Sequence, residues 1–371
     1  MSLPQTLADL VAFPTVSTEP VTQLADYLAD RCDAAGMRIE RFHSSPGKCN
    51  LVCSAGPAGT DGVILSGHMD VVPVVGQPWT SDPFILTPRG DRLYGRGSCD
   101  MKAFLAAIVH ALPSLQLQRL ERELMLVFTF DEEVGCHGSR ELADAFLEVQ
   151  RPVPTACLIG EPTSMSIFRM HPGHTAVRVV CVGKAAHSSK PDLGRSAILA
   201  AGRVIRALEL LAEEWSRRVQ FADLLDRPFV VMNIGTIQGG NAINIVPDRC
   251  VLEVGFRPLP GMDPDVLIAE LRERALEAGA VDVSALRTTP AMLTPEGTAL
   301  EGILRGFGAT PRPGAAAFAT DGGNLQKLGV QTLVFGPGSI DVAHQADEYV
   351  PLGELHAAVD VVQAVVHARC R

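Results

Sequence analysis

The chain has 371 residues, of which 47% are hydrophobic and 20% are charged, and its formal net charge is −10. The composition is typical of a globular protein, and the length favours two domains over one core. An acidic chain without a Lys/Arg cluster is not expected to bind nucleic acid, and no apolar run is long enough to predict a membrane span. The N-terminal residues lack the pattern of a secretory signal, and nine scattered cysteines suit reduced thiols, so we expect a cytoplasmic protein.

Strands and helices are expected to alternate through the first half of the chain. The apolar run at 63–66 predicts a strand, and residues 102–112 predict a helix that follows a loop containing Gly and Asp. Residues 123–130 predict a strand, 138–148 a helix and 155–160 another strand. This alternation predicts an α/β sheet with parallel pairs, and the unbroken apolar runs predict strands that are covered on both faces.

The pattern changes near residue 173. The expected order is then strand, helix, strand, strand, helix and strand, at 174–183, 194–215, 229–237, 250–258, 263–279 and 281–286. This β-α-β-β-α-β order predicts a compact ferredoxin-like α+β unit. A strand and loop at 331–339 and a closing helix at 353–370 return to the earlier pattern. We therefore expect a domain at 173–287 that is inserted in a larger α/β domain made of residues 1–172 and 288–371.

Polar side chains follow several of the predicted strands, where open α/β sheets bind their ligands. These residues, with one acid that precedes the helix at 102–112, are His68, Asp70, Asp131, Glu132, Glu133, Glu161, His344 and Asp100. Taken singly, Asp100 could cap a helix and Glu161 could simply end a strand. Together, histidine nitrogens and carboxylate oxygens suit Zn, Co or Mn, and about five ligands suit two ions that share a bridging carboxylate.

A carboxylate that is not a metal ligand is needed to move a proton in hydrolysis. Glu132 and Glu133 are adjacent, and neighbours on an extended segment point to opposite sides, so one could face the ions and the other the water. The alternation allows either order. Asp131 is left without an assigned role.

The motifs of the chain are similar to those of a known family. They are "SGHMDVVP", "GRGSCDMKA", "TFDEEVGCHGS", "GEPTS", "GKAAHSSKP", "GGNAINIVPD", "FRPLPG" and "GPGSIDVAHQADEYV", and they span residues 66 to 350. The chain resembles the M20-type co-catalytic zinc amidohydrolases and peptidases. The resemblance implies a zinc-peptidase-like mixed sheet flanked by helices, with an inserted ferredoxin-like α+β domain through which two copies form a homodimer.

The resemblance also implies roles for the polar residues at the strand ends. The ligands of two Zn²⁺ ions per subunit, for which Co²⁺ can substitute, would be His68, Asp100, Glu133, Glu161 and His344. Asp100 would bridge the ions, with His68 and Glu161 on one and Glu133 and His344 on the other. Asp70 would orient the His68 ring, and Glu132 would be the general base.

Substrate contacts are implied in both parts of the chain. His187 would reach the active site of the partner subunit and stabilise the developing oxyanion. Asn244 and Arg257 would meet the substrate, with a turn residue and a strand-end structural arginine as their alternatives. The backbone of the loop containing Gly336, Gly338 and Ser339 would line the same pocket. Cys99 and Cys136, which lie beside implied ligands, are assigned to packing.

The implied reaction is removal of the acetyl group from an N-acetylated amino acid, with N-acetyl-L-ornithine, in arginine biosynthesis, as the expected substrate. Hydrolysis of acetylcitrulline, succinyl-diaminopimelate, another acylated amino acid or a dipeptide remains an alternative, because residues 320–324 depart from the family pattern beside the pocket. A non-catalytic binding protein would lack a ligand or the base, yet every matching position is filled. A serine hydrolase would need a G-x-S-x-G elbow, which the sequence does not contain.

Overall fold

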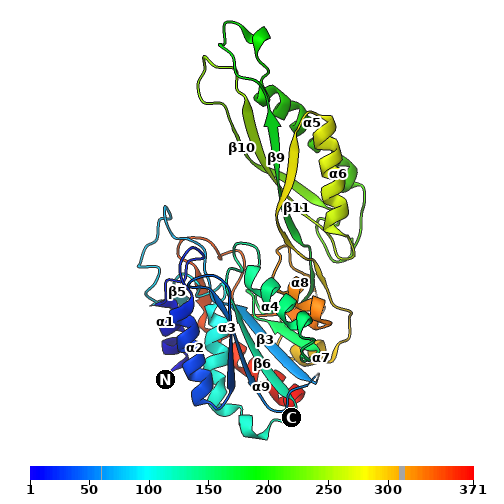
Figure 1. The fold of residues 1–371 in the computed structure, drawn as a ribbon. Coiled ribbons are helices and arrows are strands. Elements are labelled where there is room, and N and C mark those ends of the chain that lie inside the picture. The colour runs from blue at the N-terminus through cyan, green and yellow to red at the C-terminus, as the bar shows by residue number, and fades with distance from the viewer. Residues whose placement is uncertain (60, 309–313) are drawn as a thin grey trace. The chain divides into compact units, whose positions relative to one another are not determined.

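The computed structural model describes residues 1–59, 61–308 and 314–371. The chain divides into two compact units (Figure 1). Unit 1 comprises Met1–Met170, Met292–Ala316 and Thr320–Arg371, and unit 2 comprises His171–Ala291 and Ala317–Ala319. The chain therefore leaves unit 1, forms nearly all of unit 2, and returns to unit 1.

Unit 1 is built around a large mixed sheet. Its strand order is β1-β2-β6-β3-β7-β15-β8-β13, with β14 paired to β8. The bounds are β1 Arg38–His43, β2 Cys49–Ala55, β3 Gly62–His68, β6 Glu123–Thr129, β7 Ala156–Ile159, β8 Phe168–His171, β13 Met292–Leu293, β14 Gly314–Ala315 and β15 Gln331–Val334. Strands β6, β3, β7 and β15 are neighbours and run parallel, as the alternation of strands and helices predicts.

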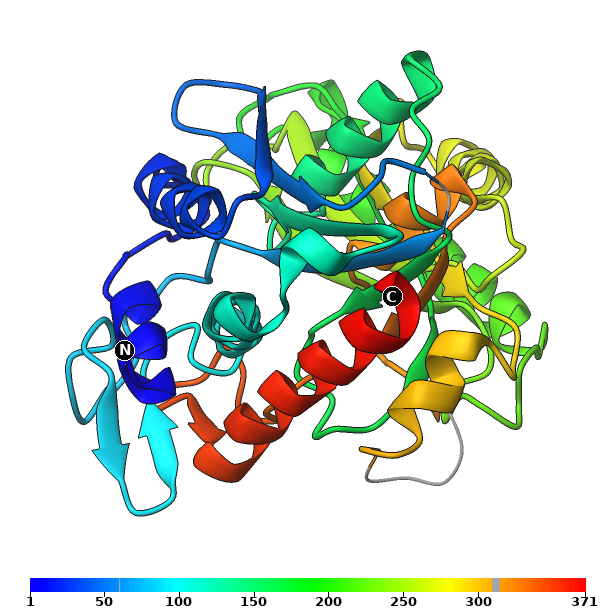
Figure 2. The ribbon, with the colours of Figure 1, turned by 90° about the horizontal axis from the view of Figure 1, so that it is seen from below.

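A hydrophobic core lies on each face of this sheet. Successive side chains on a strand point to opposite faces and so enter different cores. Leu51 and Cys53 of β2 pack into one hydrophobic core, and Val52 between them packs into the other. The first core also contains helices α1 (Leu3–Val11), α2 (Thr22–Ala34), α3 (Lys102–Ala111), α7 (Ala299–Leu304) and α9 (Leu352–Cys370). The second contains α4 (His137–Glu148) and α8 (Gly322–Leu325). Figure 2 shows α9, red and ending at the C mark, along one side of the strands.

Shorter elements complete unit 1. A small antiparallel sheet has the order β16-β5-β4, with bounds β4 Thr87–Arg89, β5 Arg92–Tyr94 and β16 Tyr349–Pro351. Short 3-10 turns are η1 (Leu112–Ser114), η2 (Leu117–Arg119) and η4 (Gln326–Leu328). Helices α1 and α2 and strands β1 and β2 were not among the expected elements. Ser2 caps α1 by accepting a hydrogen bond from the Gln5 N–H at 3.4 Å, and Pro4 lies in its first turn.

Unit 2 has the expected β-α-β-β-α-β order. The elements are β9 (His174–Val182), α5 (Ala197–Ser216), β10 (Val231–Gly239), β11 (Arg249–Arg257), α6 (Pro264–Glu277) and β12 (Asp282–Thr289), with the 3-10 turn η3 at Pro191–Leu193. The strands pair antiparallel in the order β10-β11-β9-β12, which is the ferredoxin-like arrangement. Trp215 of α5 packs against Phe256 of β11, with ring centroids 5.3 Å apart, in the core of this unit.

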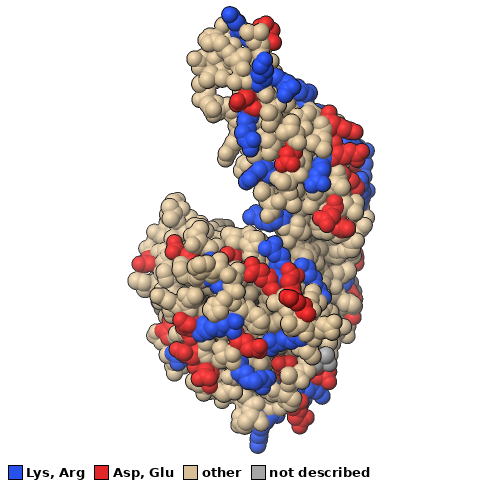
Figure 3. Space-filling view, viewed as in Figure 1, with Lys and Arg blue, Asp and Glu red and all other residues tan. Residues whose placement is uncertain are grey.

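The surface carries charges of both signs. On the face of unit 1 drawn in Figure 3, Lys and Arg are interspersed with Asp and Glu. None of the described helices, including α5 and α9, combines the length and apolarity that crossing a membrane requires.

Candidate active site

The parallel strands in the middle of the unit 1 sheet bring the polar residues to one edge. His68 is the last residue of β3, and Glu132 and Glu133 follow β6 after a short connection. Glu161 follows β7, and His344 lies in the segment that follows β15. Because neighbouring parallel strands end at the same edge, side chains far apart in the sequence become neighbours there.

Asp100, in the loop before α3, lies between the two histidines. Its Oδ1 is 3.0 Å from His68 Nε2, and its Oδ2 is 3.3 Å from His344 Nε2. His344 Nε2 is also 2.9 Å from Glu133 Oε2, and His68 Nε2 is 3.8 Å from Glu161 Oε1. The two oxygens of the Asp100 carboxylate thus face two different histidines. His68 lies beside Glu161, and His344 lies beside Glu133.

Potential ligand atoms gather within 4.8 Å of one another in two overlapping groups. One contains His68, Asp100 and Glu133, and the other contains His68, Glu132 and Glu161. The geometry therefore brings the five implied ligands and the implied base into one cluster. It also places Glu132 beside ligand atoms, so distance alone does not separate the base from the ligands.

Burial and mutual repulsion disfavour the negative charge of this cluster. Burial, followed by the nearby Asp100 carboxylate, raises the pKa of Glu133 to about 7. Burial also raises the pKa of Glu132 and of Glu161 well above the usual range. A bound cation would relieve this repulsion, and a set of carboxylate oxygens and imidazole nitrogens matches a hard or borderline dication. The residues present therefore fit a metal centre.

The neighbouring carboxylates favour the positively charged form of the two histidines. Burial alone would lower the pKa of His68, but the hydrogen bond to Asp100 and the surrounding carboxylates raise it well above its usual value. Hydrogen bonds to Asp100 and then Glu133 raise the pKa of His344 to about 10. Burial would raise the pKa of Asp100, but hydrogen bonds from His344 and His68 lower it overall. Each histidine is therefore held by carboxylates on the side that faces the cluster.

Asp70 organises the cluster through its main chain as well as its side chain. His68 Nδ1 donates to the Asp70 main-chain oxygen at 2.9 Å, so the other ring nitrogen, Nε2, points toward Asp100. The Asp70 carboxylate is 3.8 Å from Nδ1, so the hydrogen bond that orients the ring is made by the Asp70 carbonyl. The carboxylate accepts the N–H groups of Glu132 and Glu133 at 3.0 and 3.3 Å, and it therefore fixes the glutamate loop.

Asp131, to which the sequence assigns no role, forms an ion pair. Lys48 Nζ is 2.7 Å from Asp131 Oδ1 and also donates to the main-chain oxygens of Ser17 and Glu19 at 2.7 and 2.8 Å. Asp131 has a φ of +51°, in the left-handed region that non-glycine residues seldom occupy. Lys48 therefore holds the first residue of the acid block while the next two residues turn toward the cluster.

Replacing Lys48 with methionine is expected to lower the free energy of unfolding by about 3 kcal/mol, because a largely buried carboxylate loses its cation. Urea denaturation measures the change. The control is Arg41→Met, which removes an ion pair of 2.8 Å whose Asp26 side chain is 63% exposed, and which should cost no more than about 1 kcal/mol. Equal losses in the two variants would show that Lys48 has no special structural role.

The segment at residues 320–324 supports the glutamate loop from another side. Thr129 Oγ1 donates to Asp321 Oδ2 at 2.6 Å, and Asn324 Nδ2 donates to the Cys136 main-chain oxygen at 3.2 Å. The Cys136 thiol donates to Glu132 Oε1 at 3.3 Å. Glu132, Cys136 and Asp321 also form a third group of potential ligand atoms within 4.8 Å. Cys136 therefore contacts a site residue in addition to its packing.

The loop after β15 packs against the segments that carry Asp100 and Glu161. Gly336 N–H donates to Thr163 Oγ1 at 3.1 Å, and the Cys99 thiol donates to the Ser339 main-chain oxygen at 3.4 Å. Gly338 has a φ of +87°, and a Cβ there would lie 2.4 Å from Cys99 Sγ. The close approach of this loop to the residue before Asp100 therefore requires glycine.

The remaining implied residues lie in unit 2. His187 is exposed, and its Nδ1 is 2.7 Å from Ser189 Oγ. A β-bridge joins His187 to Ile245, and Ser188 N–H donates to the Asn244 main-chain oxygen at 2.9 Å, so these two segments lie side by side. Arg257 ends β11, and burial lowers the pKa of its guanidinium. Among the described residues, no carboxylate lies within ion-pair distance of Arg257.

Several residues that support the site are not among those predicted from the sequence. They are Ser17, Lys48, Arg96, Asp321 and Glu348. Arg96 and Glu348 lie inside the motifs "GRGSCDMKA" and "GPGSIDVAHQADEYV", which also contain Asp100 and His344. Their place in these motifs could have indicated that they belong to the site. Lys48 and Ser17 have no local signal, because their contacts are with residues distant in the sequence.

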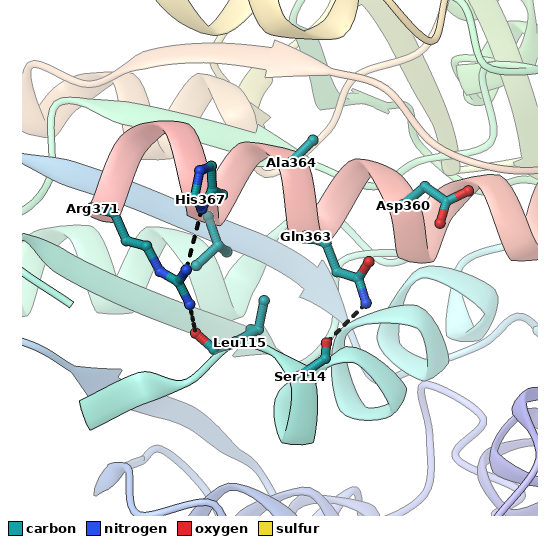
Figure 4. A pocket seen from close by; sticks show the side chains of 8 residues that line it. Ser114, Leu115, Asp360, Gln363, Ala364, His367 and Arg371 are labelled. Atoms are coloured by element: carbon teal, nitrogen blue, oxygen red, sulfur yellow. Dashed lines mark hydrogen bonds between the residues drawn. The ribbon is translucent and has the colours of Figure 1, made fainter. Parts of the chain in front are cut away.

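A hollow of about 430 Å³ lies beside α9 (Figure 4). Its polar groups bond to one another: Gln363 Nε2 donates to Ser114 Oγ at 2.8 Å, and Arg371 Nη2 donates to the Leu115 main-chain oxygen at 3.0 Å. These contacts fasten the last helix to the segment that follows α3.

The sequence is similar to curated proteins over most or nearly all of its length. An acetylornithine deacetylase of Myxococcus xanthus is 37% identical over 380 residues, covering 99% of this chain and 97% of the relative. An acetylornithine deacetylase of Klebsiella pneumoniae (strain 342) is 35% identical over 339 residues, covering 87% of this chain and 84% of the relative.

Solved structures share the fold. An M20 family metallo-carboxypeptidase from Sulfolobus solfataricus superposes with a TM-score of 0.81 at 18% identity, covering 99% of this chain and 98% of that chain. A Bacillus subtilis protein described as a dinuclear metal binding peptidase from the M20 family has a TM-score of 0.71 at 16% identity, covering 99% and 97%. The fold class expected from the sequence, a mixed sheet flanked by helices, is confirmed.

Residues 64–368 match the family description Peptidase family M20/M25/M40, and this span includes every residue of the cluster in unit 1. The chain belongs to peptidase family M20/M25/M40.

Proposed function

We propose that the protein is a metal-dependent amidohydrolase that cleaves N-acetyl-L-ornithine to L-ornithine and acetate, a step of arginine biosynthesis. The observation that carries the reaction type is the cluster around Asp100, whose two oxygens lie 3.0 and 3.3 Å from two histidine nitrogens. The substrate is supported by acetylornithine deacetylases at 35–37% identity over most of the chain.

Two zinc ions per chain, or cobalt in their place, are proposed to occupy this cluster. His68 and Glu161 would hold one ion, Glu133 and His344 the other, and Asp100 both. Ions held in this way supply acidity to a water molecule and polarise the acetamide carbonyl. The conflict between burial and negative charge at Glu133 and Glu161 supports the assignment, because a dication removes the cost of ionising them.

Glu132 is proposed as the general base. It would take a proton from the water that attacks the acetamide carbon, and then give that proton to the amine nitrogen as the C–N bond breaks. The Asp70 carboxylate accepts the main-chain N–H of Glu132 at 3.0 Å, and Cys136 contacts Glu132 Oε1 at 3.3 Å, so both the backbone and the carboxylate of this residue are held. This preorganisation favours a proton carrier over a freely moving surface glutamate.

Residues of unit 2 are proposed to bind the substrate. Arg257 suits an α-carboxylate, because its guanidinium is partly buried and has no carboxylate partner among the described residues. Asn244 would contact the substrate, and His187 would stabilise the developing oxyanion in the partner subunit of a homodimer formed through unit 2. The backbone of the loop of Gly336, Gly338 and Ser339 is also proposed to contact the substrate.

Substrate choice is tested by measuring kcat/KM, with zinc added, for N-acetyl-L-ornithine, N-acetyl-L-citrulline, N-succinyl-L,L-diaminopimelate and a dipeptide. N-acetyl-L-ornithine is expected to give the highest value, with N-acetyl-L-citrulline discriminated by its neutral side chain. A higher value for any other member of the panel would reassign the substrate and leave the metal chemistry intact.

A further inference from the structure

A buried ion pair lies directly behind the cluster. Arg96 and Glu348 are each 1% exposed, and Arg96 Nη1 donates to Glu348 Oε2. The second guanidinium nitrogen, Nη2, donates to Gln77 Oε1 at 2.6 Å. One planar cation thus joins two acceptors from segments that are far apart in the sequence, a role that suits arginine and not lysine.

Glu348 fixes the backbone of the central carboxylate. Its Oε1 accepts the N–H groups of Cys99 and Asp100 at 2.9 and 3.0 Å. Its main-chain oxygen accepts the N–H of Gly95 at 2.9 Å, which keeps this residue beside the segment that leads to Asp100. Because Arg96 balances its charge, Glu348 can approach Asp100 without adding net negative charge to the cluster.

Gln77 fixes the backbone of the second histidine. Its Nε2 donates to the His344 main-chain oxygen at 2.8 Å, while its Oε1 accepts from Trp79 Nε1 at 3.0 Å and from Arg96. His344 has a φ of +62°, and its side chain is 49% exposed. Asp100 and Glu133 hold the ring on the side of the cluster, and Gln77 holds the backbone from which the ring extends, so the position of the imidazole depends on both.

We propose that Gln77, Arg96 and Glu348 act together as positioning residues that set the separation of Asp100 and His344 for metal binding. Gln77 holds the main chain of His344, and Glu348 holds the main chain of Asp100. Arg96 connects Gln77 and Glu348 because it bonds directly to both. The inference rests on the proposed function in one respect, that the cluster binds two ions. It adds residues that are outside the proposed set of metal ligands and substrate contacts.

Substitutions of Gln77 and of Glu348 are expected to have different effects on metal binding. Gln77→Met removes the bond to the His344 carbonyl, and it should weaken one of two binding steps by roughly 10- to 100-fold. Glu348→Gln disturbs Asp100, which faces both groups of ligands, so it should weaken both steps by a similar factor. Arg96→Lys should behave like Glu348→Gln, because an ammonium cannot span Glu348 and Gln77 in one plane.

The test is calorimetric titration of zinc into the metal-stripped full-length protein, with the thermal midpoint of each stripped variant recorded alongside. The matched control is Arg151→Met, which removes an arginine that bonds both oxygens of Glu40, at 2.8 and 2.7 Å, in the same unit. We expect wild-type zinc affinities for the control, one weakened step in Gln77→Met and two in Glu348→Gln.

Wild-type affinities in both Gln77→Met and Glu348→Gln would overturn the inference, as would an equal loss of affinity in the Arg151→Met control. If Glu348→Gln does not fold, the partly exposed Gln77 decides the matter, because its substitution leaves the buried ion pair in place. A wild-type protein that takes up no zinc would refute the proposed function itself, which keeps the two failures distinct.

Discussion

Glu132→Gln is expected to lower kcat for N-acetyl-L-ornithine by roughly 10²- to 10⁴-fold, the usual contribution of a general acid–base group. Glutamine keeps the shape and can still meet the Cys136 thiol, which lies 3.3 Å from Glu132 Oε1, but it cannot accept the proton of the attacking water. Zinc content should stay at the wild-type value, because the proposed ligands are unchanged. Steady-state kinetics and elemental analysis of the same preparation check both parts.

The equivalent change at Glu133 provides the comparison. Glu133→Gln removes the carboxylate that lies 2.9 Å from His344 Nε2, so it should lower zinc content as well as activity. If Glu132→Gln loses zinc and Glu133→Gln keeps it, the roles of the two glutamates are exchanged. Near-normal turnover in Glu132→Gln would remove this residue from the proton transfer.

Asp100→Asn is expected to abolish activity by removing the charge that both ions are proposed to share. Asparagine preserves the shape of the side chain, but only one of its two terminal atoms can face a cation as an acceptor. Zinc affinity should fall at both binding steps, by more than the roughly 10- to 100-fold that follows loss of a residue that only orients a ligand. Calorimetric titration of the stripped protein measures both steps.

Asp26→Asn is the matched control for this change. It makes the same substitution in unit 1 at an aspartate that pairs with Arg41 on the surface, 2.8 Å away and 63% exposed. Zinc binding and kcat should be those of the wild type. An Asp100→Asn protein that still bound two zinc ions with wild-type affinity would show that Asp100 does not bridge them.

Much of the fold can be read from the sequence because apolar runs and turn residues act locally. The strand at 123–129 and the helices at 102–111 and 352–370 lie where the pattern predicts them, as does the β-α-β-β-α-β order of unit 2. Helices α1 and α2 were missed. These helices carry polar residues between their buried ones, and their apolar residues pack into the large core with residues from distant segments.

The cluster could be predicted because parallel strands bring their carboxyl ends to one edge. Its supports could not, because they depend on contacts across long stretches of sequence. Lys48 and Asp131 are 83 positions apart, and Arg96 and Glu348 are 252 apart. Neither pairing leaves a periodic or spaced pattern that local reasoning can detect. The acid block at 131–133 is now divided: Asp131 pairs with Lys48, while Glu132 and Glu133 face the cluster.

The most direct test of the account is zinc titration into the stripped protein with ornithine release from N-acetyl-L-ornithine followed at each addition. We predict that the stripped protein releases no ornithine, and that activity rises to its maximum as occupancy approaches two zinc ions per chain. Full activity in the stripped protein, or no ornithine release at full zinc occupancy, would contradict the account.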